Sequence, residues 1–272
     1  MSLPCAIEAL QQTNSLLVIS GSGISQESGI PTYRGDHGLY QDKNRMLCFD
    51  DLRQNPYKVW RVVDEMRRLV FDKRPNRAHQ ILALWEKKTV FSRFLLATQN
   101  IDHLHYEAGS RRVCEIHGNV WKLAQKKPQQ YTESQEFSDE LLLANHPEYR
   151  EDILKKWSEE NGYDVWIDKQ IFATVPPDVE DNVRPHIHFF DEPYNNKLLW
   201  IDDFAKNKVD TILTIGCSGK VTVVHMMIER IKKYNAHSKL IDINCNANDV
   251  PADIHLRGKA TQVLQDIDDG LR

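Results

Sequence analysis

The sequence predicts an α/β fold in which helices cover both faces of a mainly parallel sheet. Short apolar, β-branched runs alternate along the chain with longer segments of helical periodicity. Glycine or polar turns follow several of these runs, as they do where buried parallel strands end. The length of 272 residues suits one large domain that carries a smaller one.

The predicted elements follow one another in a regular order. Leu16–Ser20 (LLVIS) reads as the first buried strand, because it is a short apolar run that ends at glycines. Valines and leucines recur at helical spacing over Pro56–Phe71. The remaining elements of this first half are a helix at Ala78–Lys87, a strand at Phe94–Thr98, a short helix at Asp102–Ala108 and an apolar run at Val113–Ile116.

Residues 122–182 break this alternation. They are rich in Gln, Glu and Lys and contain a mixed amphipathic stretch at 151–157, so we expect an inserted, mostly helical module. The core is then 1–121 together with 183–272. Its second half is predicted to contain an extended segment at His186–Phe190, helices at Lys197–Lys206, Thr222–Lys233 and Ala260–Asp269, and strands at Thr211–Ile215 and Leu240–Ile243.

Composition narrows the class of protein. A net charge of −4, with 27% charged and 41% hydrophobic residues, is near the average for globular proteins, which argues against disorder and against a polybasic DNA-binding protein. No apolar run approaches the ~20 residues of a membrane helix. The segment MSLPCAIEAL lacks the basic region of a signal peptide. We therefore expect a cytoplasmic protein without a membrane partner.

Small residues after the first strand suit a phosphate group. Gly21, Ser22 and Gly23 precede a short helix expected near Ser25, and backbone N–H groups in such a turn can approach a pyrophosphate closely. The run differs from G-x-G-x-x-G, so a purely structural tight turn is an equal alternative for this feature alone.

Further motifs stand at the predicted carboxyl ends of strands, where open α/β sheets bind ligands. They are G-I-P-T-Y-R-G at 29–35, T-Q-N-I-D at 98–102 and E-I-H-G at 115–118. Together with the glycine turn, these segments resemble the sirtuin family of NAD-dependent enzymes. Three later segments are also similar to that family: Gly216–Ser218, Ile241–Asn244 and Arg257–Ala260. The resemblance implies a Rossmann-like sheet.

The resemblance also implies roles for individual residues. His117 would be the general base that acts on a ribose hydroxyl, a task that suits an imidazole. Asn100 and Asp102 would assist it by orienting the nicotinamide ribose and the carboxamide. The NAD⁺-binding residues implied in this way are Gly21, Ser22, Gly23, Ser25, Tyr33, Arg34, Gln99, Asn100, Asp102, Gly216, Cys217, Ser218 and Asn244. The shared chemistry is cleavage of the nicotinamide–ribose bond.

Two departures from the family concern the acceptor. Deacylating sirtuins carry a zinc module with two C-x-x-C pairs, whereas 122–182 contains no cysteine, so we expect no zinc. The segment at 184–192 resembles the strand that pairs with an acyl-lysine peptide. His188 and Asp191 replace a valine and a glycine of that strand, which places bulky polar groups where the acceptor would lie.

Simpler alternatives apply to several of these side chains. His186 and His188 could form a metal pair but are better explained as polar residues at the rim of the cleft. His103 and His105 are expected to make local hydrogen bonds. Cys217 has no base at a readable spacing and is not expected to be a nucleophile.

These observations favour an NAD⁺ hydrolase in which water takes the place of the acceptor. By resemblance to bacterial sirtuin-like proteins, such an enzyme could deplete NAD⁺ in antiviral defence, under control of a regulatory partner or in a homo-oligomer. The alternatives are an NAD-dependent protein-lysine deacylase, an ADP-ribosyltransferase and a non-catalytic nucleotide sensor. His117 argues against the sensor, because a binding-only site needs no base.

Overall fold

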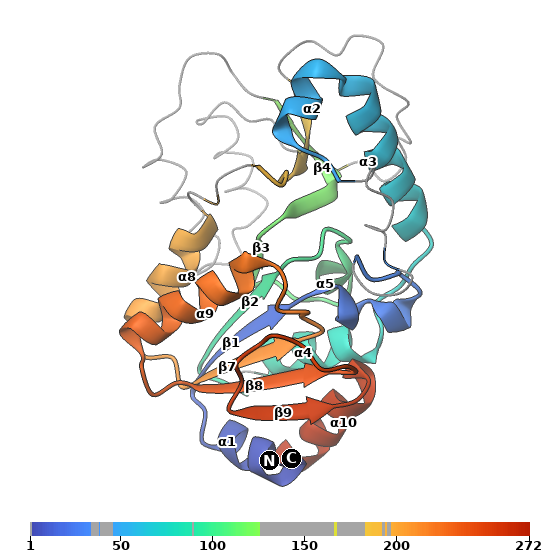
Figure 1. Cartoon of the computed structure of the whole chain (residues 1–272). Helices are drawn as coiled ribbons and strands as arrows, with labels where there is room; N and C mark the ends of the chain where they lie inside the picture. The colour runs from blue at the N-terminus through green and yellow to red at the C-terminus, as the bar shows by residue number, and fades with distance from the viewer. Residues whose placement is uncertain are drawn as a thin grey trace.

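The computed structural model describes residues 2–33, 38, 46–88, 90–125, 166–167, 183–191, 194 and 197–272. Its largest feature is a six-stranded parallel sheet with the order β3-β2-β1-β7-β8-β9 (Figure 1). The strands are β1 (Ser15–Ser20), β2 (Arg93–Thr98), β3 (Val113–Glu115), β7 (Thr211–Ile215), β8 (Lys239–Asn244) and β9 (Ile254–Arg257). The predicted α/β class is confirmed.

Helices cover both faces of this sheet, as Figure 1 shows. One face packs against α1 (Leu3–Gln11), α4 (Arg77–Lys87) and α10 (Ala260–Leu271), and the other packs against α8 (Lys197–Lys206) and α9 (Thr222–Tyr234). Alternate side chains of β1 point to opposite faces of the sheet. Leu16 and Val18 pack in the apolar cluster under α1, α4 and α10, whereas Leu17 and Ile19 pack in the cluster under α8 and α9. All six residues of β1 are buried, which explains its continuous apolar run.

The central pair of strands comes from distant parts of the chain. β1 lies between β2 and β7, with Leu16 opposite Thr211 and Ser20 opposite Ile215. The short run after β1 forms two 3-10 turns, Ser22–Ile24 and Gln26–Ser28, in place of the single short helix predicted near Ser25. The left-handed Gly29 (φ 83°) ends the second turn.

A second, antiparallel sheet lies beside the first and has the order β5-β4-β6. Its strands are β4 (Gly118–Gln125), β5 (Trp166–Ile167) and β6 (Val183–Ile187). α3 (Pro56–Val70) packs against β4 in a separate apolar cluster that includes Val59, Val63 and Val120. Most of 122–182, where a mostly helical module was predicted, lies outside the described residues. The described residues in this range, 122–125 and 166–167, belong to strands β4 and β5.

Several elements were not predicted. They are α1, α2 (Phe49–Gln54), β4, β5 and β9, while the predicted helix after Asp102 shortens to α5 (Leu104–Glu107). α1 begins at Leu3, with Pro4 in its first turn, and buries only Ala6 and Leu10, so its apolar pattern is short. Within the described part of the chain, no helix is long and apolar enough to cross a membrane.

Candidate active site

The carboxyl ends of β1, β2, β3, β7 and β8 meet at one edge of the parallel sheet, where a cavity of about 590 Å³ opens. This cavity lies between the edge of the parallel sheet and the small antiparallel sheet. It is lined by these predicted residues: Gly21, Ser22, Gly23, Tyr33, Gln99, Asn100, His117, Gly216, Cys217, Ser218 and Asn244. Motifs from distant parts of the sequence therefore share one cavity.

Two of the described predicted residues do not line it. Ser25 and Asp102 lie behind Asn100, where they border a much smaller void. The predicted Arg34 falls outside the described residues. Ser25 and Asp102 therefore act on the cavity only through the side chains in front of them.

Two glycine turns meet back to back at the floor of the cavity. Gly21 N donates to Ile215 O (2.9 Å), and Gly23 N donates to Gly216 O (3.1 Å). A Cβ on Gly23 would lie 2.6 Å from Gly216 Cα, a separation that real Cβ atoms do not reach. Gly216 itself has φ 62°, which favours glycine. Glycine is therefore required at these positions because the turns after β1 and β7 approach each other closely. The backbone of both turns lines the cavity.

A buried polar network supports Asn100. Asn100 Nδ2 donates to Gly21 O (3.2 Å) and to Ser25 Oγ (3.1 Å), and Ser25 Oγ in turn donates to Asp102 Oδ2 (2.7 Å). Burial raises the pKa of the Asp102 carboxyl, although its hydrogen bonds from Ser25 and Leu104 N act the other way. Asn100 Oδ1 is buried and accepts no hydrogen bond from the described residues. An unused acceptor at the cavity wall is a position for an N–H donor of a ligand.

Two histidines complete this network and stay neutral. Burial lowers the pKa of His105 to about 3, and burial also lowers the pKa of His79 well below its usual value. His105 Nε2 shares a hydrogen bond with Ser20 Oγ (2.9 Å), so His105 is a hydrogen-bonding group as predicted, but its partner lies on β1 and not nearby in the sequence. His79, which was not predicted from the sequence, belongs to the same network: its Nε2 lies 3.4 Å from Ser25 Oγ. Its position on the buried face of α4 was the available signal.

His117 stands at the end of β3 with both ring nitrogens in hydrogen bonds. Nδ1 lies 2.9 Å from Gln99 O, and Nε2 lies 2.9 Å from the hydroxyl of Tyr194. Because a carbonyl oxygen only accepts, Nδ1 carries a proton, and when the ring is neutral Nε2 carries the lone pair. Gly118, which follows, has φ 80°, and a Cβ there would lie 2.0 Å from His186 O. The E-I-H-G motif therefore needs its glycine for the close approach of β4 and β6.

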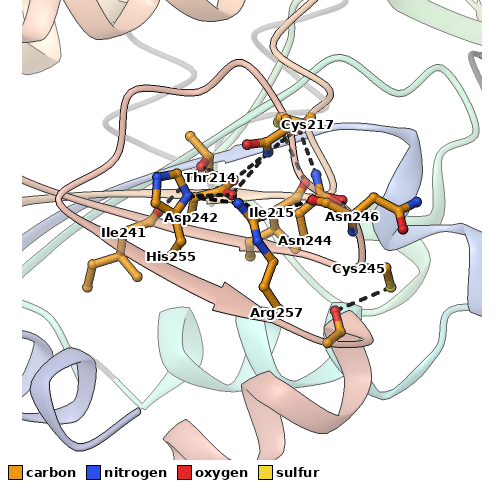
Figure 2. Close-up of polar contacts among 12 residues, drawn as sticks. Thr214, Ile215, Cys217, Ile241, Asp242, Asn244, Cys245, Asn246, His255 and Arg257 are labelled. Carbon is orange, nitrogen blue, oxygen red and sulfur yellow. Dashed lines mark hydrogen bonds and ion pairs between the residues drawn. The ribbon is translucent and has the colours of Figure 1, made fainter. Parts of the chain in front are cut away.

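The opposite end of the cavity is organised by Asp242, a fully buried residue of β8. Figure 2 shows Thr214, His255 and Arg257 converging on its carboxylate. Asn248 Nδ2 also donates to Asp242 and reaches Cys217 O at 2.8 Å. Asn244 Nδ2 donates to the same carbonyl (2.8 Å). These bonds hold the loop after β8 against the turn after β7.

Cys217 belongs to this turn and is buried. Burial, together with the nearby Asp242 carboxylate, raises the pKa of its thiol to about 12. A thiol that stays protonated is a poor nucleophile, which supports the prediction that Cys217 does not act as one.

Comparison with known proteins agrees with this arrangement. The model of the Sir2 family matches residues 21–223, which span the glycine turn, the His117 segment and the start of α9. The chain belongs to the Sir2 family. The sirtuin resemblance seen in the sequence is thus confirmed.

Individual relatives of this Sir2 protein match different parts of it. An NAD-dependent protein deacylase of Pyrococcus furiosus is 29% identical over 265 residues, 97% of this chain and 95% of the relative. NAD-dependent protein deacylase 1 of Caldanaerobacter subterraneus is 42% identical over 118 residues, 43% of this chain and 48% of the relative. A solved Sir2 homolog–NAD complex superposes with a TM-score of 0.73 at 23% identity, over 99% of this chain and 95% of that one, which supports the fold.

Another wall of this cavity is formed by the end of β6 and the residues that follow it. Ile187, His188, Phe189 and Phe190 line it beside His117. Asp191 is exposed at the turn that follows. The described residues contain no group of three or more His, Cys, Asp or Glu side chains that could hold a metal. The zinc prediction concerns 122–182, most of which lies outside the described residues.

Proposed function

We propose that this Sir2 protein is an NAD⁺-dependent deacylase of acylated lysine side chains. The main support is that the glycine turn, the His117 imidazole and the segment Ile187–Phe190 at the end of β6 line one and the same cavity. Relatives that match nearly the whole chain are named NAD-dependent protein deacylases, which supports deacylation over NAD⁺ hydrolysis. The sequence prediction put NAD⁺ hydrolysis first, and the comparisons favour its stated alternative.

The residues at the cavity fit NAD⁺ as a substrate. Gly21 and Gly23 leave backbone open to a pyrophosphate at the floor. The unused Asn100 Oδ1 is an acceptor for the amide N–H of a nicotinamide carboxamide. Asn244 and Ser218 line the far end, where the adenosine half would lie.

His117 supplies the base. Its proton sits on Nδ1, held by Gln99 O, so that Nε2 is the nitrogen that can accept a proton from a ribose hydroxyl. Loss of nicotinamide leaves positive charge on the ribose, and a cavity with preorganised polar groups stabilises such charge. The acyl oxygen of the lysine would then capture the ribose.

NAD⁺ hydrolysis is the second candidate, and one observation favours it. His188 and Tyr194 lie against His117, so aromatic rings occupy part of the space beside the base. A narrowed acceptor side admits water more readily than a peptide. ADP-ribosyl transfer, control by a partner and a role in defence stay predictions from the sequence.

One experiment separates the two candidates. The protein is incubated with NAD⁺, with and without an acetyl-lysine peptide, and nicotinamide, free ADP-ribose and acyl-ADP-ribose are quantified. The deacylase proposal expects nicotinamide release that depends on the peptide and yields acyl-ADP-ribose. Peptide-independent release with free ADP-ribose would instead establish the hydrolase. His117→Ala should abolish either activity, and full turnover in that variant would refute the assigned base.

A further inference from the structure

The lone pair of the base is already engaged in this structure. Nδ1 of His117 donates to Gln99 O, so in the neutral imidazole that a base requires, the Tyr194 hydroxyl, 2.9 Å from Nε2, is the donor in that hydrogen bond. A ribose hydroxyl cannot reach Nε2 directly while Tyr194 is in this position. Proton transfer from the ribose hydroxyl to Nε2 therefore requires either that Tyr194 moves away or that the Tyr194 hydroxyl relays the proton.

The pairing of β4 with β6 brings the rings together. Gly118 is opposite Ile187, and His188 N donates to His117 O (2.9 Å), so His117 and His188 are cross-strand neighbours. Their rings are nearly parallel, with an interplanar angle of 17° and centroids 6.1 Å apart. Tyr194 stacks on His188 at 4.1 Å and 24°.

Packing opposes departure of Tyr194. Its ring is partly buried and packs against the apolar cluster formed by β1, β7, α8 and α9. Burial also raises the pKa of its hydroxyl, so the proton that it offers to Nε2 is retained at neutral pH. All three rings line the same cavity. The hydroxyl of Tyr194 therefore lies in the same cavity as the base and occupies the hydrogen-bonding position at Nε2.

We propose that Tyr194 is a catalytic residue that carries the proton from the ribose hydroxyl to His117, and that His188 positions it by stacking. The ribose O–H gives its proton to Tyr194 Oη as the Tyr194 O–H gives its own to His117 Nε2. Tyrosine is regenerated in the same step, and the ribose oxygen becomes the nucleophile that attacks the carbon of the captured acyl group. The relay rests on the proposed deacylase function, because in a hydrolase the nucleophile would be water.

Tyr194→Phe keeps the ring and removes only the hydroxyl. We expect kcat to fall by about 100-fold, the lower range for loss of a proton-transfer group, with KM for NAD⁺ changed by less than about threefold. Tyr234→Phe is the matched control, because Tyr234 is exposed at the end of α9, far from the base in the sequence and outside the cavity lining. A Tyr194→Phe enzyme as active as the wild type, or more active, would show that the hydroxyl merely covers the base.

The positioning role of His188 is tested by rescue. His188→Phe preserves a stacking ring and should retain most of the wild-type kcat, whereas His188→Ala removes the stack and should lose activity toward the level of Tyr194→Phe. Equal activity in the two His188 variants would overturn this part of the proposal.

A spectroscopic measurement tests the hydrogen bond without turnover. In ¹⁵N spectra of the intact protein, Tyr194→Phe should shift the Nε2 resonance of His117 and leave the Nδ1 resonance, held by Gln99 O, nearly unchanged. An unmoved Nε2 resonance would refute the contact on which the relay depends. A wild-type protein that releases no nicotinamide with any acceptor would refute the proposed function instead, so the two failures are distinguishable.

Discussion

A buried ion pair joins the parallel sheet to the small sheet, and breaking it should be costly. Lys122 Nζ on β4 lies 2.6 Å from Glu115 Oε2 on β3, and the two side chains are only 7% and 8% exposed. Lys122→Met keeps most of the apolar stem but leaves the carboxylate without its charge partner. Removal of one partner from a buried pair costs about 3–5 kcal/mol. Asn119 Nδ2 still donates to Glu115 Oε1 (2.6 Å), so we expect the lower end, about 3 kcal/mol.

Urea unfolding followed by tryptophan fluorescence measures this loss. The control is the double variant Glu115→Gln/Lys122→Met, which removes both charges and should recover most of the stability, since a neutral amide needs no counter-ion. A single Lys122→Met variant that loses less than about 1 kcal/mol, or a double variant no more stable than the single, would refute the reasoning.

The same pair predicts a pH dependence. Burial alone would raise the pKa of Glu115, but the charge of Lys122 and the hydrogen bond with His103 outweigh it, so the pKa lies well below its ordinary 4.5. A depressed pKa in the folded state means that the unfolded chain takes up the proton first. The contribution of the pair should therefore be complete above the ordinary pKa and decline as the pH falls below it. The double variant should lack this part of the acid sensitivity.

Three further outcomes follow from the site. Gly118→Ala would place a Cβ 2.0 Å from His186 O at a residue with φ 80°, so it should displace β4 from β6. Both kcat and the thermal stability should fall, and wild-type values of both would contradict this geometry. Cys217, with its pKa near 12, should resist thiol alkylation in the folded protein and react only in urea, and rapid native labelling located there by mass spectrometry would count against its burial. Asp242→Ala leaves the donors of Thr214, Asn248 and Arg257 without their acceptor, so it should destabilise the protein by about 3 kcal/mol and raise KM for NAD⁺. An unchanged KM would show that this network does not support NAD⁺ binding.

The parallel core was predictable because each buried strand is a continuous apolar run bounded by glycine or polar residues. β1 and β7 were located almost to the residue for that reason. α1 and β9 were missed because they bury few side chains, and a short pattern does not stand out from its neighbours. The prediction of strand ends was enough to place Gln99, His117 and Gly216 in one cavity.

The sequence could not reveal which polar groups would meet across the fold. His188 was singled out by its departure from the family, but the role of Tyr194 depends on the register of β4 with β6 and on the turn after it. His79 and Ser25 are 54 positions apart and meet only because α4 packs beside the glycine turn. Ser25 and Asp102 were assigned to the cofactor, whereas the structure places them behind Asn100.

The central position of β1 has a consequence for synthesis of the chain. β1 is made early, but its neighbour β7 is separated from it by about 190 residues. Closing a loop of that length costs about 4–5 kcal/mol of chain entropy before the pairing is gained. Until the ribosome has passed residue 215, the run Leu16–Ile19 has a bare edge and an uncovered apolar face. Nascent chains of this protein should therefore depend on chaperones for longer than proteins whose central strands are sequence neighbours.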